Sequence, residues 1–140
     1  VPEIEYHQSE TRKKKYRKDL RILVVEDETN NGFVITEMLK HLGFSHKIKY
    51  VANGKKCVDE VKSETYDVVL MDIIMPVMDG IEATKHLRQM SNRPYIIITS
   101  AVVQNSEKER CQQLGVDGYL TKPILKENLY TVLKPLILDP

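Results

Sequence analysis

Short apolar runs recur along the chain at intervals that suit strands separated by helices. The runs around Leu23, Val69 and Ile97 contain no polar residue, which is typical of strands buried on both faces of a parallel sheet. A weaker alternation of polar and apolar residues predicts one further strand after the first. The five predicted strands cover residues 22–25, 47–51, 67–72, 95–99 and 118–121.

Each predicted strand is followed by apolar residues at helical spacing. In the first of these segments, Ile35, Leu39 and Leu42 fall on one face of a helix. Asn30 or Asn31 is expected to cap the start of this helix, because a short polar side chain can accept a hydrogen bond from a free backbone N–H. Further helices are predicted over 57–61, 81–90, 106–114 and 125–136.

Pro135 falls within the last helical pattern, and we expect the helix to end or kink there. Five strands alternating with five helices predict an α/β fold with right-handed crossovers and helices on both faces of the sheet. The predicted architecture is therefore a three-layer sandwich around a parallel five-stranded sheet.

Composition excludes several functional classes. The chain has 140 residues, of which 41% are hydrophobic and 29% charged, as expected for one soluble globular domain. The formal net charge of +1 gives no overall attraction to nucleic acid or membrane. No apolar run approaches the ~20 residues of a membrane span, and no apolar signal core opens the chain. Cys57 and Cys111 are far apart in the sequence, so we expect reduced core thiols in a cytoplasmic protein.

Residues 1–19 differ in composition from the rest of the chain. They are polar and contain a basic cluster within 12–18, without an apolar period. We interpret this segment as a linker or tail, in preference to a contact with nucleic acid or anionic lipid. The Val-Pro start and the Asp-Pro end resemble cut points, so we expect the chain to be a piece of a longer protein.

Polar residues follow the predicted strands at their C-terminal ends. Glu26 and Asp27 follow the first strand, Asp72 ends the third, Ser100 follows the fourth and Lys122 the fifth. In a parallel sheet these positions share one edge, where α/β folds place their ligands. Clustered carboxylates attract a hard cation such as Mg²⁺, and a cation beside an ammonium group favours an incoming phosphoryl group. Taken alone, Asp72 could equally be a turn or helix-capping aspartate.

Four of these segments resemble one known family. Residues 20–138 resemble the receiver domain of two-component response regulators, particularly the receivers attached to hybrid sensor histidine kinases. The resemblance implies a flavodoxin-like (CheY-like) fold with strand order 2-1-3-4-5. The matching segments are ILVVED at 22–27, VVLMDIIMPVMDG at 68–80, IIITSA at 96–101 and GYLTKPI at 118–124.

The resemblance implies a role for each residue of the polar edge. Asp72 corresponds to the phosphoacceptor, which attacks a phosphohistidine and forms an acyl phosphate. Asp27 corresponds to a direct Mg²⁺ ligand, and Glu26 to an acid that acts on the ion through water. The backbone carbonyl of Ile74 corresponds to the remaining protein ligand. Lys122 corresponds to the lysine that pairs with the phosphoryl oxygens.

Two further residues correspond to a conformational switch. Ser100 matches the hydroxyl that turns toward the phosphoryl group, and Tyr119 matches the aromatic side chain that follows it inward. Alternatives remain for both: Ser100 could cap the next helix and Tyr119 could be ordinary packing. Lys122 could likewise be a surface charge.

The sequence departs from the family pattern at several positions. Ser100 replaces the commoner threonine, which removes a methyl group that restricts rotamers. Glu28 adds a negative charge at the rim of the site or caps the following helix. Ile74 and Val102 correspond to positions that flank the path of the attacking water, and neither side chain can orient that water. We therefore expect slow autodephosphorylation.

The implied partners are a histidine kinase or a histidine phosphotransfer protein, docked near the first helix. Phe33, Val34 and Met38 are candidates for that docking surface, although helix core explains some of them equally well. We expect neither nucleic-acid nor membrane contact by the domain itself, and a monomer or a weak phosphorylation-dependent dimer. In a membrane-bound sensor kinase the domain would belong to the cytoplasmic part.

Other functional classes fit the sequence less well. A pseudo-receiver that never binds metal could lose any of Asp27, Asp72 or Lys122, yet all three are present. A phosphoester hydrolase would need a second aspartate where Ile74 stands. A flavodoxin-like cofactor carrier would need a Gly- or Ser/Thr-rich phosphate loop after the first strand. We therefore expect a self-catalysing phosphoacceptor rather than a conventional enzyme.

Overall fold

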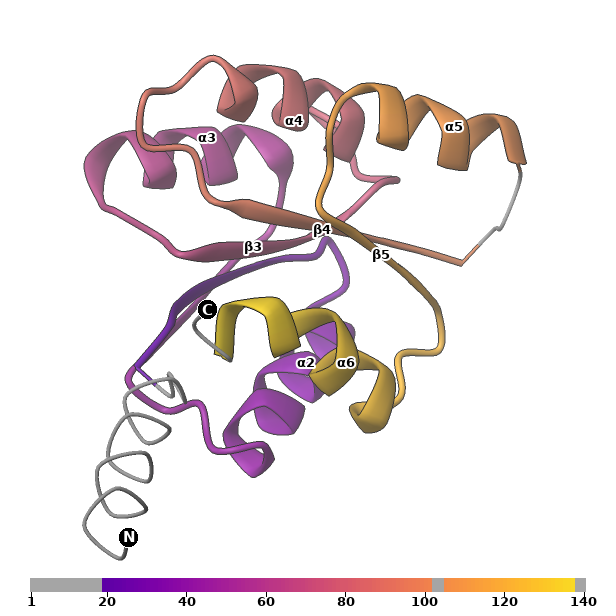
Figure 1. The fold of residues 1–140 in the computed structure, drawn as a ribbon. Helices are drawn as coiled ribbons and strands as arrows, with labels where there is room; N and C mark the ends of the chain where they lie inside the picture. Colours follow the sequence, from indigo (N-terminus) through magenta and orange to yellow (C-terminus); the bar gives the residue numbers. More distant parts are fainter. Residues whose placement is uncertain (1–18, 102–104, 138–140) are drawn as a thin grey trace, which may run out of the picture.

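Strand β3 (Val68–Asp72) forms the centre of a five-stranded parallel sheet with the order β2-β1-β3-β4-β5. The computed structural model describes residues 19–101 and 105–137. Helices α3, α4 and α5 cover one face of the sheet, and α2 and α6 cover the other (Figure 1). The other strands are β1 (Arg21–Val25), β2 (Lys47–Val51), β4 (Tyr95–Ser100) and β5 (Gly118–Thr121). The helices are α2 (Thr29–His41), α3 (Gly54–Ser63), α4 (Gly80–Arg88), α5 (Asn105–Gln113) and α6 (Lys126–Ile137).

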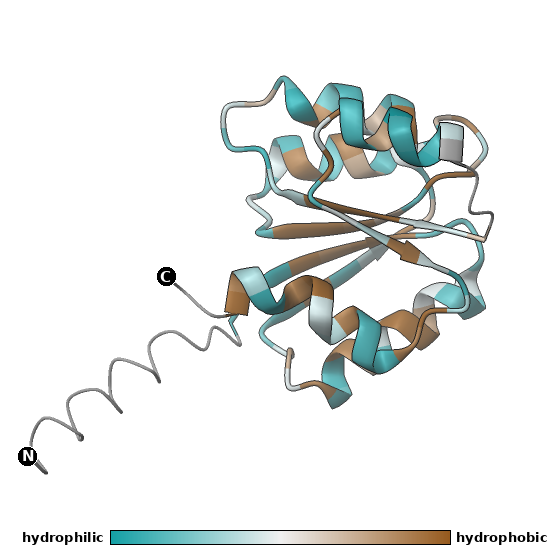
Figure 2. Cartoon of the chain, turned by 45° about the vertical axis from the view of Figure 1, so that its right-hand side comes forward, coloured by the Kyte–Doolittle hydropathy of each residue, from teal (hydrophilic) through white to brown (hydrophobic). Residues whose placement is uncertain are grey.

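The strand prediction is confirmed to within one residue at each end, and the register explains why the apolar runs contain no polar break. Ile22 pairs with Val68, which in turn pairs with Tyr95, so β1, β3 and β4 lie in parallel register. Side chains alternate between the two faces of a strand, and both faces of this sheet are covered. The β1 side chains from Ile22 to Val25 are therefore buried on both faces, and much of the sheet is coloured as hydrophobic between the helical layers (Figure 2).

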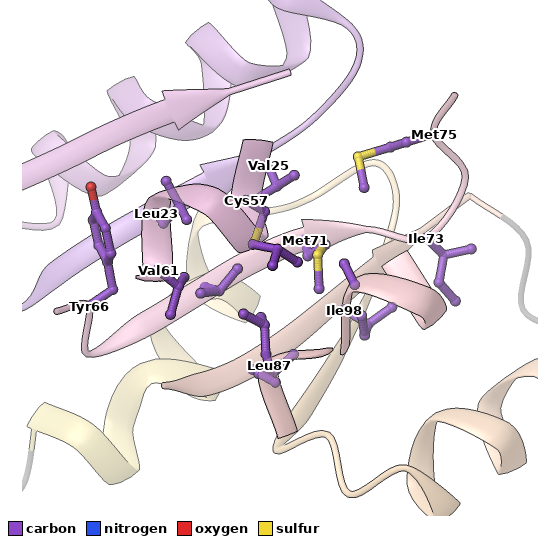
Figure 3. Close-up of a cluster of buried hydrophobic side chains, with 14 of the residues drawn as sticks. Leu23, Val25, Cys57, Val61, Tyr66, Met71, Ile73, Met75, Leu87 and Ile98 are labelled. Carbon is purple, nitrogen blue, oxygen red and sulfur yellow. The ribbon is translucent and has the colours of Figure 1, made fainter. Parts of the chain in front are cut away.

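Two hydrophobic clusters, one on each face of the sheet, hold the layers together. Leu23, Met71 and Ile98 pack under α3 and α4 with Leu87 and Cys57 (Figure 3). Burial raises the pKa of the Cys57 thiol to about 12. The second cluster lies between the sheet and the pair α2 and α6. Cys57 and Cys111 are both free and buried, as predicted.

Helix α2 begins earlier than the sequence suggests. It starts at Thr29 with Glu28 in the N-cap position, so Asn30 and Asn31 lie inside the helix and the prediction that either caps it is wrong. The first helical hydrogen bond runs from the Gly32 N–H to the Glu28 carbonyl at 3.0 Å. The Glu28 side chain makes no capping hydrogen bond. The backbone thus becomes helical immediately after the acidic turn.

Helix α6 continues past Pro135 to Ile137, so the proline does not end the helix, and the alternative expectation of a kink at Pro135 stays a prediction. Leu133 and Ile137 are one turn apart and fully buried. A proline in the last turn lacks one hydrogen-bond donor, and the burial of Ile137 offsets that loss.

Of the predicted basic segment, only Asp19 is described, and Val102 also lies outside the described residues. The predicted boundary between this segment and the folded domain therefore stays a prediction. Across residues 19–101 and 105–137, no helix combines the length and apolar character required to cross a bilayer.

Candidate functional site

Two neighbouring strands bring three carboxylates together at the C-terminal edge of the sheet. Val25, the last residue of β1, pairs with Met71, so Glu26 and Asp27 emerge beside Asp72. One carboxylate oxygen from each of the three acids lies within 4.8 Å of the others. Glu26 is 1% exposed and Asp72 5%, whereas Asp27 is exposed. The cluster is therefore closed on the protein side and accessible from solvent beside Asp27.

Lys122 joins this cluster from the end of β5. Its ammonium nitrogen lies 3.1 Å from Glu26 Oε2 and 3.1 Å from Asp72 Oδ2. The Lys122 backbone N–H donates to the Ser100 carbonyl at 2.8 Å, which fixes the position of the lysine at the sheet edge. The following peptide bond to Pro123 is cis. Lys122 thus bridges two acids and is not a surface charge.

The carboxylates carry more negative charge than Lys122 can balance. Burial raises the pKa of Asp72 to about 6, and the neighbouring charge of Glu26 adds to the effect while Lys122 opposes it. Burial alone would lower the pKa of Lys122, but hydrogen bonds to Glu26 and Asp72 bring it above its usual value. An oxygen-rich pocket with excess negative charge is the donor set that a hard divalent cation prefers.

The loop between β3 and α4 folds tightly over the end of the sheet. The Ile74 N–H donates to Asp72 Oδ1 at 3.4 Å, and the Met78 N–H donates to the Pro76 carbonyl at 2.8 Å. Between them Val77 has a φ of 71°, a left-handed conformation that is strained for a β-branched residue. The Ile74 side chain points to solvent and is 63% exposed. Its backbone carbonyl as a metal ligand stays a prediction.

Gly80 allows this loop to close against Asp72. The Gly80 N–H donates to the Ile73 carbonyl at 2.8 Å, and a β-carbon at residue 80 would come within 2.4 Å of the Asp72 carbonyl oxygen. The side chain of Asp79 caps α4 by accepting a hydrogen bond from the Glu82 N–H at 2.9 Å. The Asp-Gly pair therefore starts the helix and keeps the end of β3 in place.

Ser100 and Tyr119 share one acceptor. The Ser100 hydroxyl donates to Glu107 Oε1 at 3.0 Å, and the Tyr119 hydroxyl donates to the same oxygen at 3.1 Å. Ser100 is buried and Tyr119 half-buried, and the tyrosine ring packs against the cluster under α3 and α4. The sequence analysis identified Ser100 and Tyr119 as candidate site residues but did not identify Glu107. An acidic residue in a polar helix is usually exposed to solvent, so nothing distinguished Glu107 from its neighbours.

Glu26 has two supporting contacts that the sequence did not indicate. The Tyr50 hydroxyl donates to the Glu26 backbone carbonyl, and Asn31 Nδ2 lies 3.5 Å from Glu26 Oε1. Tyr50 lies on the edge strand β2, next to β1 in the sheet. The alternation of polar and apolar residues predicted strand β2, but nothing in that pattern indicated that the Tyr50 hydroxyl reaches the acidic turn.

Comparison with known proteins links this geometry to one family. Residues 22–134 match the family described as response regulator receiver domain. The chain is 36% identical over 118 residues to hybrid signal transduction histidine kinase G of Dictyostelium discoideum, covering 82% of this chain and 3% of that protein. It is 37% identical over 119 residues to two-component response regulator ORR41 of Oryza sativa subsp. japonica, covering 84% of this chain and 94% of that protein.

A solved structure shares the fold at a similar level of identity. It is the receiver domain of sensor histidine kinase PA1611 from Pseudomonas aeruginosa PAO1, with a magnesium ion coordinated in the active site cleft. The TM-score is 0.77 at 36% identity, covering 86% of this chain and 98% of that one. The chain thus spans a small part of the kinase from Dictyostelium and nearly all of the rice regulator.

Proposed function

The chain belongs to the response regulator receiver domain family, and on this premise we propose that Asp72 is the residue that accepts the phosphoryl group. One observation carries the proposal: Asp72 ends the central strand, is 5% exposed, and lies within reach of two further acids and the Lys122 ammonium group. A buried carboxylate with a raised pKa at a sheet edge is poorly explained by packing and well explained by chemistry.

We propose that Glu26, Asp27 and Asp72 hold Mg²⁺, with the Ile74 carbonyl as a further ligand. Their oxygen atoms fit a hard cation, and the raised pKa of Asp72 reflects negative charge that a cation would relieve. When bound, Mg²⁺ supplies positive charge that stabilises the phosphoryl oxygens during transfer. Asp27, as the exposed member, is the acid most accessible to an ion arriving from solvent.

In the proposed reaction, a carboxylate oxygen of Asp72 attacks the phosphorus of a phosphohistidine. An O–P bond forms as the P–N bond breaks, and the electron pair of that bond leaves with the imidazole of the donor. Lys122, now paired with Glu26 and Asp72, would turn one or more N–H donors to the phosphoryl oxygens. The negative charge of the phosphoryl group on Asp72 would then reorient Ser100 and Tyr119. Their movement would alter the face formed by α5, β5 and α6.

The proposed phosphodonor is a histidine kinase or a histidine phosphotransfer protein. Among the described residues, the large apolar side chains that are exposed all lie on α2 or on the loops at the C-terminal edge of the sheet. They are Phe33, Val34, Ile74, Val77 and Leu125. A groove of about 520 Å³ places Val34, Met38 and Ile124 beside Lys122. An apolar rim around a charged pocket suits a partner that must bring its histidine to Asp72.

We further propose that the chain is the receiver part of a hybrid sensor kinase and that it functions in the cytoplasm. Similarity to kinase G of Dictyostelium supports the first point, and two free cysteines are compatible with a reducing compartment. A phosphorylation-independent interaction module is the less favoured alternative. Such a module would not need Asp72 and Lys122 to be paired in a buried, acidic pocket.

Incubation with acetyl phosphate and Mg²⁺, followed by intact-protein mass spectrometry, tests the proposal. We expect one added phosphoryl group on the wild type, dependent on Mg²⁺, and none on Asp72→Asn. Asp59→Asn is the matched control, because it removes an exposed carboxylate of α3 far from the pocket. Failure of the wild type to become modified or to bind Mg²⁺ would leave the interaction module as the better description.

A further inference from the structure

Helix α5 carries a carboxylate that the proposed reaction does not use. Glu107 lies one turn before Cys111, which is 1% exposed, so both residues lie on the side of α5 that faces the sheet. Glu107 also lines a cavity of about 410 Å³ together with Ile73 and Ile74, next to the loop that closes over Asp72. An acidic side chain thus lies close to the loop over Asp72 without belonging to the metal cluster.

The contacts of Glu107 are with the two proposed switch residues. Its Oε1 atom accepts the Ser100 hydroxyl at 3.0 Å and the Tyr119 hydroxyl at 3.1 Å. The Lys108 ammonium group lies 5.8 Å from the centre of the Tyr119 ring. Hydrogen bonds to a charged acceptor are stronger than those between neutral groups. Glu107 therefore stabilises the arrangement in which Ser100 donates away from Asp72.

A phosphoryl group on Asp72 would compete with Glu107. Thr99, the residue before Ser100, pairs with Asp72 across β3 and β4, so the serine is near the phosphorylation site. A hydroxyl group has a single proton to donate, and a phosphoryl oxygen and the Glu107 carboxylate are both anionic acceptors. Ser100 cannot donate fully to both. The hydrogen bond between Ser100 and Glu107 must therefore break when the Ser100 hydroxyl donates to the phosphoryl group.

We propose that Glu107 is a positioning residue that holds Ser100 and Tyr119 in the unphosphorylated arrangement and opposes the switch. The inference rests on the proposed function, since it assumes a phosphoryl group on Asp72. Loss of the Glu107 carboxylate would lower the cost of turning Ser100, so a phosphoryl group or its mimic would bind more tightly. The strength of the hydrogen bonds to Glu107 would set the fraction of unphosphorylated molecules that adopt the switched arrangement.

Removing a negative charge near an anion could tighten binding without any role for Ser100. The two explanations differ in a Ser100→Ala background. An effect that acts through the serine hydroxyl disappears when that hydroxyl is absent, whereas a purely electrostatic effect persists. A double-mutant cycle therefore separates positioning from charge.

The experiment is titration of the chain with beryllofluoride in Mg²⁺, followed by ¹⁹F NMR, for six variants. They are the wild type, Glu107→Ala, Glu107→Gln, Ser100→Ala, the double variant Ser100→Ala/Glu107→Ala, and the control Glu109→Ala. Glu109 is an exposed acid on the same helix. We expect Glu107→Ala to bind beryllofluoride about five-fold more tightly than the wild type, the factor typical of one net hydrogen bond. Glu107→Gln should fall between the two, because its amide oxygen remains a weaker acceptor.

Glu109→Ala should match the wild type, and Glu107→Ala should tighten binding clearly less once Ser100 is replaced, because only its contact with Tyr119 then remains. Equal tightening in both backgrounds would overturn the proposal, as would unchanged or weaker binding by Glu107→Ala and Glu107→Gln. The glutamine variant keeps the shape of the side chain, so the result does not depend on the alanine variant folding. A wild type that does not bind beryllofluoride would overturn the proposed function, and the inference with it. Wild-type binding that is insensitive to Glu107 would overturn the inference alone.

Discussion

The aromatic ring of Tyr50 lies directly against Gly32, so that a β-carbon at residue 32 would come within 2.4 Å of Tyr50 Cε1. Gly32 lies in α2 and Tyr50 in β2, two elements separated by a loop. The close approach lets the Tyr50 hydroxyl reach the backbone carbonyl of Glu26. A glycine in a helix thus supports the turn that carries two of the three acids.

The first prediction concerns Gly32→Ala. In an open helix this change stabilises by about 1 kcal/mol because alanine has the higher helix propensity. Here we expect a loss of about 1–3 kcal/mol in the free energy of unfolding, because the added methyl group displaces the Tyr50 ring. Urea unfolding measures the effect. In a Tyr50→Ala background the clash is absent, and the same substitution should become stabilising. Stabilisation in the wild-type background would contradict this account.

The second prediction concerns Tyr50→Phe, which removes the hydrogen bond to the Glu26 carbonyl and keeps the ring. We expect a loss of about 1 kcal/mol in the free energy of unfolding and weaker Mg²⁺ binding, because the acidic turn loses a support. Calorimetric titration with Mg²⁺ measures the affinity. Tyr66→Phe is the matched control: its hydroxyl donates to Glu60 Oε2 at 3.1 Å, at the C-terminal end of α3. That variant should lose similar stability and retain the Mg²⁺ affinity, and equal losses of affinity in both would refute the prediction.

The strands and the acidic cluster could be predicted from the sequence because both depend on short-range patterns. An apolar run of four residues followed by Asp72 predicts a strand and places the aspartate at the edge of the sheet. Parallel order then brings Glu26 and Lys122 to the same edge, although 96 residues separate them. The pairing of these residues follows from topology alone.

Helix ends and side-chain acceptors could not be predicted in this way. Asn30 looked like a helix cap, yet α2 starts one residue before it because the backbone turns immediately after the acidic residues. Pro135 looked like a stop, yet the burial of Ile137 holds the last turn of α6. The contact between Glu107 and Ser100 depends on how α5 is rotated against the sheet, and no local pattern encodes that rotation.

The third prediction concerns Gly80→Ala. The new β-carbon would lie 2.4 Å from the Asp72 carbonyl oxygen and 2.9 Å from the Ile73 Cα, and neither backbone atom can rotate away as a side chain does. We expect a loss of about 2 kcal/mol or more in the free energy of unfolding, with slower phosphorylation by acetyl phosphate because Asp72 is displaced. Thermal unfolding and mass spectrometry measure the two effects.

Gly118→Ala is the control for that substitution. Its β-carbon would lie 3.3 Å from Ile97 Cγ1, a side-chain atom that can shift slightly, and Gly118 lies at the start of β5 away from Asp72. We expect a small change in stability and none in the phosphorylation rate. A Gly80→Ala variant that is phosphorylated as fast as Gly118→Ala would show that the loop does not need a glycine to position Asp72.

The fourth prediction concerns the pH dependence of stability in the absence of metal. The pKa of Asp72 lies near 6 in the folded chain, above the 3.8 of an unperturbed aspartate. Between these values the folded state binds more protons than the unfolded state, so the free energy of unfolding falls as the pH rises through this window. Above about pH 7, ionisation of Asp72 lowers the free energy of unfolding by up to about 3 kcal/mol relative to the chain with Asp72 protonated. Burial is the main cause, followed by repulsion from Glu26.

Asp72→Asn removes that cost, because a neutral amide resembles the protonated acid. In EDTA we expect Asp72→Asn to be more stable than the wild type by about 1–3 kcal/mol at pH 8 and by about a third of that at pH 4.5, as measured by urea unfolding. Asp59→Asn, an exposed control, should show no such dependence on pH. Saturating Mg²⁺ should stabilise the wild type far more than Asp72→Asn at pH 8, because the cation neutralises the charge that burial disfavours. A gain from Asp72→Asn that is the same at both pH values would show that ionisation of Asp72 is not what destabilises the metal-free fold.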